Sequence, residues 1–383
     1  MNRKELAEIK RRMDREKGCV PCIRGCYVSS KGEVISVFRR PLGEIPEGEC
    51  AAFFSLFKKV LSGVPGKNGI DVVFSSDEML TGEEHALLME LRDVRADDDT
   101  AVNTLYQKII DNYRSETSYV ILLAGDTYDV PHRHADGHQS DLQENVFQYF
   151  ICCVCPVKPI KTGLSYSASE MDFRALGPDE TLGAPELGFM FPAFDDRASN
   201  IYNALYYVRS ADQMHEDFAD AVFHTELPMS APEQKQAFVA VLEDALQEDM
   251  KFEVVQAMND RMIEAVETQK QEKQLEAPVI SSAKMKSILS DCGLPLEKLE
   301  SFGERYDAQF GRGTSLTAAN IVNTRQMEVK TPNVVIHVNP EFSDLVETRI
   351  IDGKKYILIR AEEEVELNGV SVLIGDEEES LRE

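Results

Sequence analysis

Two long apolar runs constrain the fold more than any other feature of this sequence. Tyr119–Ala124 and Val146–Cys155 consist almost entirely of aliphatic, aromatic and cysteine side chains. Both have the length of a strand, and neither alternates between apolar and polar residues as a half-exposed strand would. We therefore expect both runs to be central strands of a sheet that is covered on both faces.

Helical and strand patterns intermingle around these runs up to about residue 225. Leu6, Ile9 and Met13 recur at helical spacing near the start of the chain. The β-rich runs Ile23–Ser29 and Glu33–Arg40 then flank a short turn. This mixture predicts an α+β protein whose first domain, residues 1–228, is an α/β domain with a mixed sheet and a basic N-terminal helix.

The pattern becomes helical after Pro228. Ser230 and Glu233 form a capping box, and apolar residues recur at helical spacing to about Gln274. A second capping box, Thr81 with Glu84, predicts a helix in the first domain. Shorter helices follow to residue 310, so we expect a helical segment over residues 229–310.

The last part of the chain is rich in β-branched residues. Asp352-Gly353 and Asn368-Gly369 each separate two short strand patterns, which is the signature of a type I′ hairpin. Residues 311–383 are therefore predicted to form a β-rich unit, a β-meander with an acidic tail.

Charge is distributed unevenly along the chain. The net charge is −26, which disfavours nonspecific binding to nucleic acid or anionic lipid. Residues 1–40 nevertheless carry 11 Lys and Arg against 5 Asp and Glu, a net charge of +6. This segment is either a solvated basic surface or a contact surface for phosphate groups. The candidate nucleic-acid-binding residues are Lys10, Arg11, Arg12, Arg24, Arg39 and Arg40.

Composition also indicates a compartment. No apolar run is long enough to cross a bilayer, and Met1–Lys17 is charged throughout, unlike a signal peptide. Eight cysteines in 383 residues do not form a secreted disulfide framework. We expect a cytoplasmic protein with reduced thiols and no membrane partner.

One loop has the composition of a metal site. Imidazole and carboxylate groups both bind transition metals, and several follow the first apolar strand. These residues are His132, His134, His138, Asp126 and Asp129. They suggest a metal-dependent hydrolase, although a solvated polar loop has the same composition.

Two further groups are weaker candidates. Cys19, Cys22 and Cys26 have spacing that metal-binding thiolates can use, but a fourth ligand is missing, so simple thiols are the alternative. Asp195, Asp196 and Arg197 end an aromatic segment that begins at Pro185. They form a candidate ligand loop, whereas the phenylalanines of this segment are expected to fill the sheet core.

Several short runs resemble an uncharacterised bacterial family, the domain of unknown function number 4317. The runs are Ile23–Val28, Leu61–Gly66, Ile121–Pro131, Cys155–Val157, Leu164–Tyr166, Pro185–Arg197 and Leu205–Tyr207. This resemblance implies a cytosolic bacterial protein and brings no activity and no catalytic residues. Fainter still, the layout of Leu299–Arg360 resembles the bacterial nucleoid-associated protein family, an analogy of fold that does not determine function.

Together these features favour a non-enzymatic interaction protein that associates with nucleic acid or with a protein partner. The alternatives are the metal-dependent hydrolase and a scaffold that forms a homo-oligomer. We expect no cofactor and assign no catalytic residue.

Overall fold

The structure is a computed structural model that describes residues 1–131, 145–159, 164–167, 171–175, 180–271, 278–361 and 365–372. The chain divides into two compact units, and each is described by itself. Unit 1 covers Met1–Lys235, and unit 2 covers Gln236–Lys273 with Pro278–Glu383. Within the described ranges, no helix is long and apolar enough to cross a membrane.

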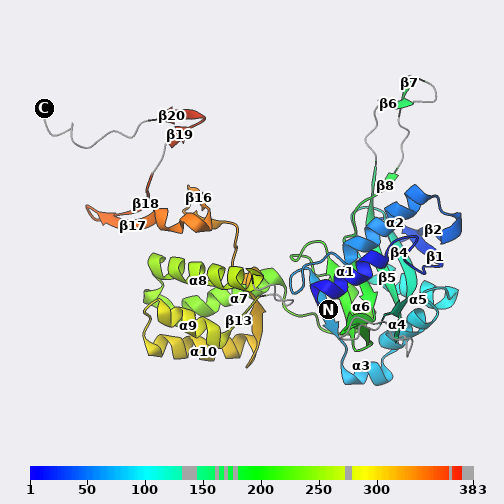
Figure 1. Ribbon diagram of the computed structural model, residues 1–383, viewed down its shortest axis with the longest axis horizontal. Helices are drawn as coiled ribbons and strands as arrows, with labels where there is room; N and C mark the ends of the chain where they lie inside the picture. The colour runs from blue at the N-terminus through cyan, green and yellow to red at the C-terminus, as the bar shows by residue number, and fades with distance from the viewer. Residues whose placement is uncertain are drawn as a thin grey trace. The chain divides into compact units, whose positions relative to one another are not determined.

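Unit 1 is built on one large sheet with the strand order β2-β1-β4-β5-β9-β12-β3, in which β8 also pairs with β5 (Figure 1). The strands are β1 (Cys22–Val28), β2 (Val34–Pro41), β3 (Gly69–Val73), β4 (Tyr119–Val130), β5 (Asn145–Pro159), β8 (Glu180–Leu182), β9 (Leu187–Phe191) and β12 (Asn203–Val208). Every pair along this path is antiparallel, which differs from the expected mixed sheet. The reason is that neighbours such as β1 and β2, or β4 and β5, follow one another directly and turn back.

The two apolar runs lie at the centre of this sheet, as predicted. Along β4, Ile121 and Leu123 belong to the hydrophobic core on one face, whereas Val120 and Leu122 belong to the core on the other. Successive strand residues point to opposite faces, so a strand covered on both sides must be apolar throughout. The expected core role of the phenylalanines near Pro185 also holds, since Phe189 and Phe194 are fully buried.

Helices cover both faces of the sheet. Ile9 of α1 (Arg3–Arg12) and Phe57 of α2 (Glu47–Val60) pack into the core on one face. The other face is covered by α4 (Glu83–Asp93), α5 (Asp99–Asn112) and α6 (Glu216–Phe223). Smaller elements are η1 (Leu42–Glu44), α3 (Ser76–Thr81), β6 (Leu164–Ser167), β7 (Asp172–Ala175), β10 (Ala193–Asp195) and β11 (Ala198–Asn200).

The capping box predicted at Thr81 is wrong. Thr81 is the last residue of α3, and the residue before α4 is Gly82. Ser75 caps α3 instead, because its side chain accepts a hydrogen bond from the backbone N–H of Glu78 at 3.1 Å. An earlier serine therefore begins the helical segment, and Thr81 is already inside it.

Unit 2 has a helical core made by α7 (Ala231–Leu246), α8 (Phe252–Gln271), α9 (Ser282–Asp291) and α10 (Leu296–Phe310). The capping box before α7 is confirmed: the N–H of Ser230 donates to Glu233 at 2.9 Å, and Ser230 Oγ accepts from the N–H of Glu233 at 3.4 Å. The long helical pattern is interrupted by η2 (Gln247–Asp249), where Gln247 adopts a left-handed φ of 50°. Short elements complete the core: β13 (Val279–Ser281), β14 (Ser315–Thr317) and α11 (Ala318–Ile321).

The C-terminal strands pair as three separate hairpins. They are β15 (Met327–Lys330) with β16 (Val335–Val338), β17 (Val346–Ile351) with β18 (Lys354–Ile359), and β19 (Val365–Leu367) with β20 (Val370–Val372); η3 (Pro340–Leu345) precedes β17. Asp352 and Gly353 both have positive φ, as do Asn368 and Gly369. Both predicted turns are therefore confirmed, and the secondary structure as a whole is that of an α+β protein.

Candidate functional site

A buried carboxylate, Asp126, lies at the centre of a polar network under α1. Its oxygens accept hydrogen bonds from the backbone N–H of Cys19 at 2.6 Å, the Tyr149 hydroxyl at 2.8 Å and Arg12 Nε at 3.3 Å. Burial, together with this carboxylate, raises the pKa of Tyr149 well above its usual value, so the phenol stays protonated and donates. Asp126 is fully buried, and these partners replace the water that it has lost.

The same network continues along α1 to the β10–β11 turn. Glu8 accepts a hydrogen bond from the Tyr128 hydroxyl and pairs with Arg197, both at 2.7 Å. Arg12 lies over the Tyr128 ring at 4.6 Å, which is cation–π geometry. Arg197 also donates to the carbonyl of Pro131 at 2.9 Å. Helical spacing explains this order, since Glu8 and Arg12 are four residues apart and share one face of α1.

The sequence-predicted loop Asp195, Asp196 and Arg197 belongs to this network. Asp195 pairs with the α-amino group of Met1 at 3.0 Å, and the N–H of Asp196 donates to Glu5 at 2.9 Å. Asp196 and Arg197 both have positive φ, 48° and 59°, in the two-residue turn. Glu5 and Glu8 of α1 hold a backbone conformation that these residues rarely adopt alone.

Most of the candidate phosphate-binding residues make contacts within unit 1. Arg24 is buried and pairs with Asp97 and Asp99, Arg39 pairs with Asp97 at 2.9 Å, and Arg40 pairs with Glu49 at 2.7 Å. Hydrogen bonds from Arg39 lower the pKa of the Asp97 carboxyl, so the pair is ionised at neutral pH. Lys10 donates to Ser62 at 2.6 Å. Arg11 is exposed on α1.

The structure does not bring the proposed metal ligands together in the part that it describes. His132, His134 and His138 lie outside the described residues. Asp126 is engaged as above, and Asp129 is exposed on β4. No group of three His, Cys, Asp or Glu side chains among the described residues could hold a metal ion.

The three clustered cysteines of the sequence, Cys19, Cys22 and Cys26, lie in three different environments. Cys19 is exposed, Cys22 donates to Asp97 at 3.4 Å, and Cys26 belongs to the hydrophobic core. Burial raises the pKa of the Cys22 thiol and of the Cys26 thiol to about 11. Such thiols are protonated at physiological pH and therefore poor nucleophiles.

We expect only Cys19 and the half-buried Cys292 to react promptly with a thiol reagent such as DTNB at pH 8. At that pH a thiol of pKa 11 is ionised in roughly one molecule in a thousand. In urea all eight cysteines should react. Prompt reaction of Cys22 in the folded protein, located by mass spectrometry, would contradict the burial of this strand.

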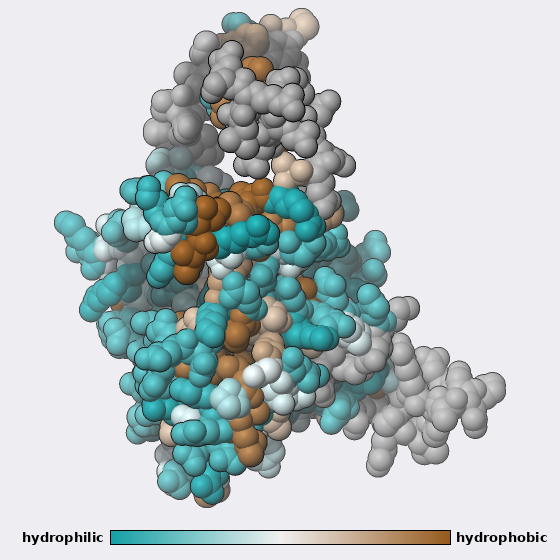
Figure 2. All heavy atoms as spheres, turned by 90° about the vertical axis from the view of Figure 1, so that its left-hand side faces the viewer, coloured by the Kyte–Doolittle hydropathy of each residue, from teal (hydrophilic) through white to brown (hydrophobic). Residues whose placement is uncertain are grey.

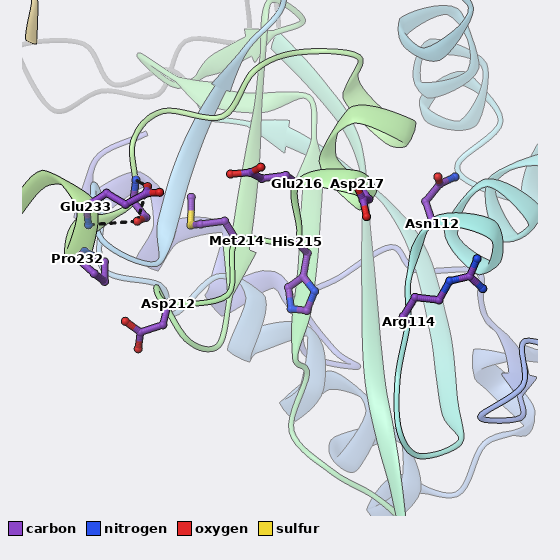
Figure 3. Close-up of a pocket in the computed structure, with 10 residues that line it drawn as sticks. Asn112, Arg114, Asp212, Met214, His215, Glu216, Asp217, Pro232 and Glu233 are labelled. Carbon is purple, nitrogen blue, oxygen red and sulfur yellow. Dashed lines mark hydrogen bonds between the residues drawn. The ribbon is translucent and has the colours of Figure 1, made fainter.

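A polar cleft of about 500 Å³ opens on the other side of unit 1 (Figure 3). His215, which precedes α6 with a left-handed φ of 50°, lines this cleft together with Arg114 and four carboxylates. Burial lowers the pKa of His215, so its imidazole is neutral at pH 7. The carboxylates lie apart around the cleft in Figure 3: Asp212, Glu216, Asp217 and Glu233. This arrangement can accept a hydrogen-bonding or cationic group.

Sequence reasoning missed Glu8, Tyr128 and Tyr149, the partners that connect the network. It also placed Arg12, Asp126 and Arg197 in three unrelated groups, whereas the structure gathers them on one face of the sheet. The one local signal was the acidic row Glu5 and Glu8 on an otherwise basic helix.

The fold and this network define an α+β protein with a two-faced antiparallel sheet and a helical second unit. The chain belongs to the family described as Domain of unknown function (DUF4317), whose model matches residues 1–370. A comparison with curated proteins finds no match. Neither finding supports the fainter resemblance to nucleoid-associated proteins.

Proposed function

We propose that this is a non-enzymatic interaction protein of the bacterial cytoplasm, and that the C-terminal hairpins of unit 2 bind a protein partner. The observation that carries the proposal is the exposure of large apolar side chains on these hairpins. Ile350 is 73% exposed, Leu367 65%, Val370 63% and Ile359 56%. Figure 2 faces unit 2 and shows hydrophobic side chains at the height that β17 and β18 have in Figure 1, and further ones below them at the height of the helices.

The architecture of the hairpins supports the same role. An isolated two-stranded hairpin is only marginally stable in water, and it needs a third strand or a packed surface. Large contiguous apolar patches on soluble proteins mark interaction sites. A partner that covers the hairpins would provide the missing packing surface and would bury the exposed apolar side chains.

Nucleic-acid association is the second candidate, and Arg11 and the other exposed cations of α1 favour it. Four of the six candidate residues, Arg12, Arg24, Arg39 and Arg40, are paired with carboxylates, so Lys10 and Arg11 are the members of this set that remain for phosphate. Fluorescence anisotropy with labelled duplex DNA, single-stranded DNA and RNA tests this candidate. Phosphate contacts predict an affinity that falls steeply with salt and that weakens when Lys10 and Arg11 are neutralised.

The hydrolase alternative depends on His132, His134 and His138, and stoichiometric metal in the purified protein would support it.

Site-specific photo-crosslinking in cells that make the protein tests the protein-partner proposal. A photo-reactive amino acid at Ile359 on β18 should give a protein adduct. The matched control is Leu296 on α10, which is 69% exposed and apolar but lies outside the hairpins. An adduct at Ile359 and none at Leu296 is the expected result. Equal labelling at both positions, or none at either, would refute a role of the hairpins.

A further inference from the structure

Two strand edges of this protein, that of β2 in unit 1 and that of β18 in unit 2, differ in their protection against pairing. In unit 1, β2 ends the sheet, and three features blunt its outer edge. A register shift leaves Ile35 as a bulge, Arg39 and Arg40 follow, and Pro41 lacks an N–H. Bulges, charges and proline are the means by which proteins prevent association through an edge strand.

Of these features β18 has only charge, at Lys354 and Lys355: its register with β17 has no bulge, and the strand contains no proline. Its residues Tyr356–Ile359 are four consecutive apolar residues, so both faces of the strand are apolar there. Tyr356 is 41% exposed and Ile359 56%. Among the described residues, β18 pairs with β17 alone. A straight apolar edge of this kind is a template for another strand.

The register shows which backbone groups of β18 are free for a new strand. The N–H of Arg360 donates to the carbonyl of Leu345 at 2.8 Å, next to the opposed pair Val346 and Ile359. Antiparallel pairs alternate between hydrogen-bonded and open positions. Ile359, Ile357 and Lys355 therefore direct their N–H and C=O groups away from β17.

The opposite edge of the hairpin is already engaged by its own chain. Gln256 on α8 donates to the carbonyl of Val346 at 3.3 Å, and the Thr348 hydroxyl donates to Glu253 at 2.7 Å. The hairpin thus has one protected edge, β17, and one open edge, β18.

Building on the interaction role proposed for these hairpins, we infer that the partner of β18 is β18 of a second copy of this chain. The strands run antiparallel about a two-fold axis at Ile357. Ile357 then opposes the partner's Ile357, Tyr356 opposes the partner's Leu358, and Lys355 opposes the partner's Ile359. The product is a four-stranded sheet with the order β17-β18-β18-β17.

Three properties of the strand favour a second copy over an unrelated protein. The two-fold axis places three of the four apolar residues opposite one another, with Tyr356 facing the partner's Leu358 and Ile357 facing the partner's Ile357, and apolar cross-strand pairs stabilise a sheet. The resulting dimer is closed, because the outer strands are both β17, which α8 contacts. Lys354–Ile359 also contains no carboxylate, so the seam brings no negative charge together in a chain of net charge −26.

Sedimentation velocity of the full chain, with a concentration series, measures the association directly. We expect a monomer–dimer equilibrium that strengthens between about 50 and 300 mM salt, a range over which the Debye length falls roughly twofold, because salt screens the net charge. Ile357→Pro should abolish the dimer while leaving the hairpin intact, since the lost N–H points away from β17. Ile357→Val should still dimerise.

Cysteine crosslinking tests the register. In a Cys19→Ser/Cys292→Ser background, Ile357→Cys should form an intermolecular disulfide on mild oxidation, because opposed residues of a hydrogen-bonded pair are about 5.5 Å apart. Ile350→Cys is the control: it is more exposed, but two copies of β17 lie about 14 Å apart across the new sheet. Equal crosslinking of both variants would exclude this register.

The outcomes separate the inference from the proposed function. A chain that stays monomeric at all concentrations overturns self-pairing. If Ile359 then crosslinks in cells to a protein of different mass, the hairpins still bind a partner, which is not a second copy. If Ile359 gives no adduct, the interaction role fails as well.

Discussion

Replacement of Asp126 by alanine is expected to lower the free energy of unfolding by about 3–5 kcal/mol, the usual effect of removing one member of a buried ion pair. The variant leaves the Tyr149 hydroxyl, the N–H of Cys19 and the Nε–H of Arg12 without their acceptor. Tyr149 is fully buried, so water cannot replace the lost carboxylate without opening the core. Urea denaturation followed by circular dichroism measures the change.

Asp129→Ala is the matched control, because Asp129 is exposed on the same strand. This substitution should change the free energy of unfolding by no more than about 0.5 kcal/mol. The double variant Arg12→Met/Asp126→Leu should be more stable than Asp126→Ala, since it removes the charge together with its counter-ion. Similar losses in Asp126→Ala and Asp129→Ala would show that the network contributes little and would favour a role of Asp126 outside stability.

Local chemistry is what the sequence conveys well. The Asp352-Gly353 and Asn368-Gly369 turns are predicted correctly because positive φ at two successive residues restricts the residue types, and this restriction does not depend on the rest of the fold. The same holds for the capping box at Ser230. The two central strands are recognisable because only strands covered on both faces are apolar throughout.

Competition between local signals explains the errors. Thr81 with Glu84 satisfies the capping pattern, yet Ser75 begins a helix six residues earlier, and one chain segment cannot follow both. Apolar residues keep helical spacing across Gln247, so periodicity alone does not reveal the end of α7. Intermingled helices and strands likewise do not specify whether neighbouring strands run parallel or antiparallel.

The network under α1 could not be predicted for a different reason. Glu8 and Arg197 are 189 residues apart in sequence, and Arg12 and Asp126 are 114 apart. Each of these residues has an ordinary local explanation as a surface charge. Only the sheet, which places β4 and the β10–β11 turn under one helix, makes them partners. Proposals based on a charge run in sequence, such as phosphate binding by residues 1–40, therefore need the fold to show which charges are already paired.

Gly125→Ala is expected to be the most damaging of the glycine substitutions, with a loss of about 3 kcal/mol, at the upper end for overpacking. A Cβ at Gly125 on β4 would lie 2.2 Å from the carbonyl oxygen of Arg95 and 2.7 Å from its Cα. The obstacle is backbone, held by left-handed φ at Arg95 and Ala96, and Ala96 is buried. The strand and this loop therefore cannot separate without exposing the core.

Gly25→Ala and Gly48→Ala separate this effect from glycine replacement in general. At Gly25 the obstacle is the ring of Phe38, a half-buried side chain on the edge strand that can rotate away, so the loss should be smaller and Phe38→Ala should relieve it. At Gly48 in α2 nothing lies within 4 Å, and alanine should stabilise the helix by about 0.5–1 kcal/mol. Thermal unfolding should show the melting temperature falling in the order Gly48→Ala, Gly25→Ala, Gly125→Ala. If Gly125→Ala proved as stable as Gly25→Ala, the Arg95 loop would have to move as freely as a surface side chain, and the close packing of α4 against the centre of the sheet would be disproved.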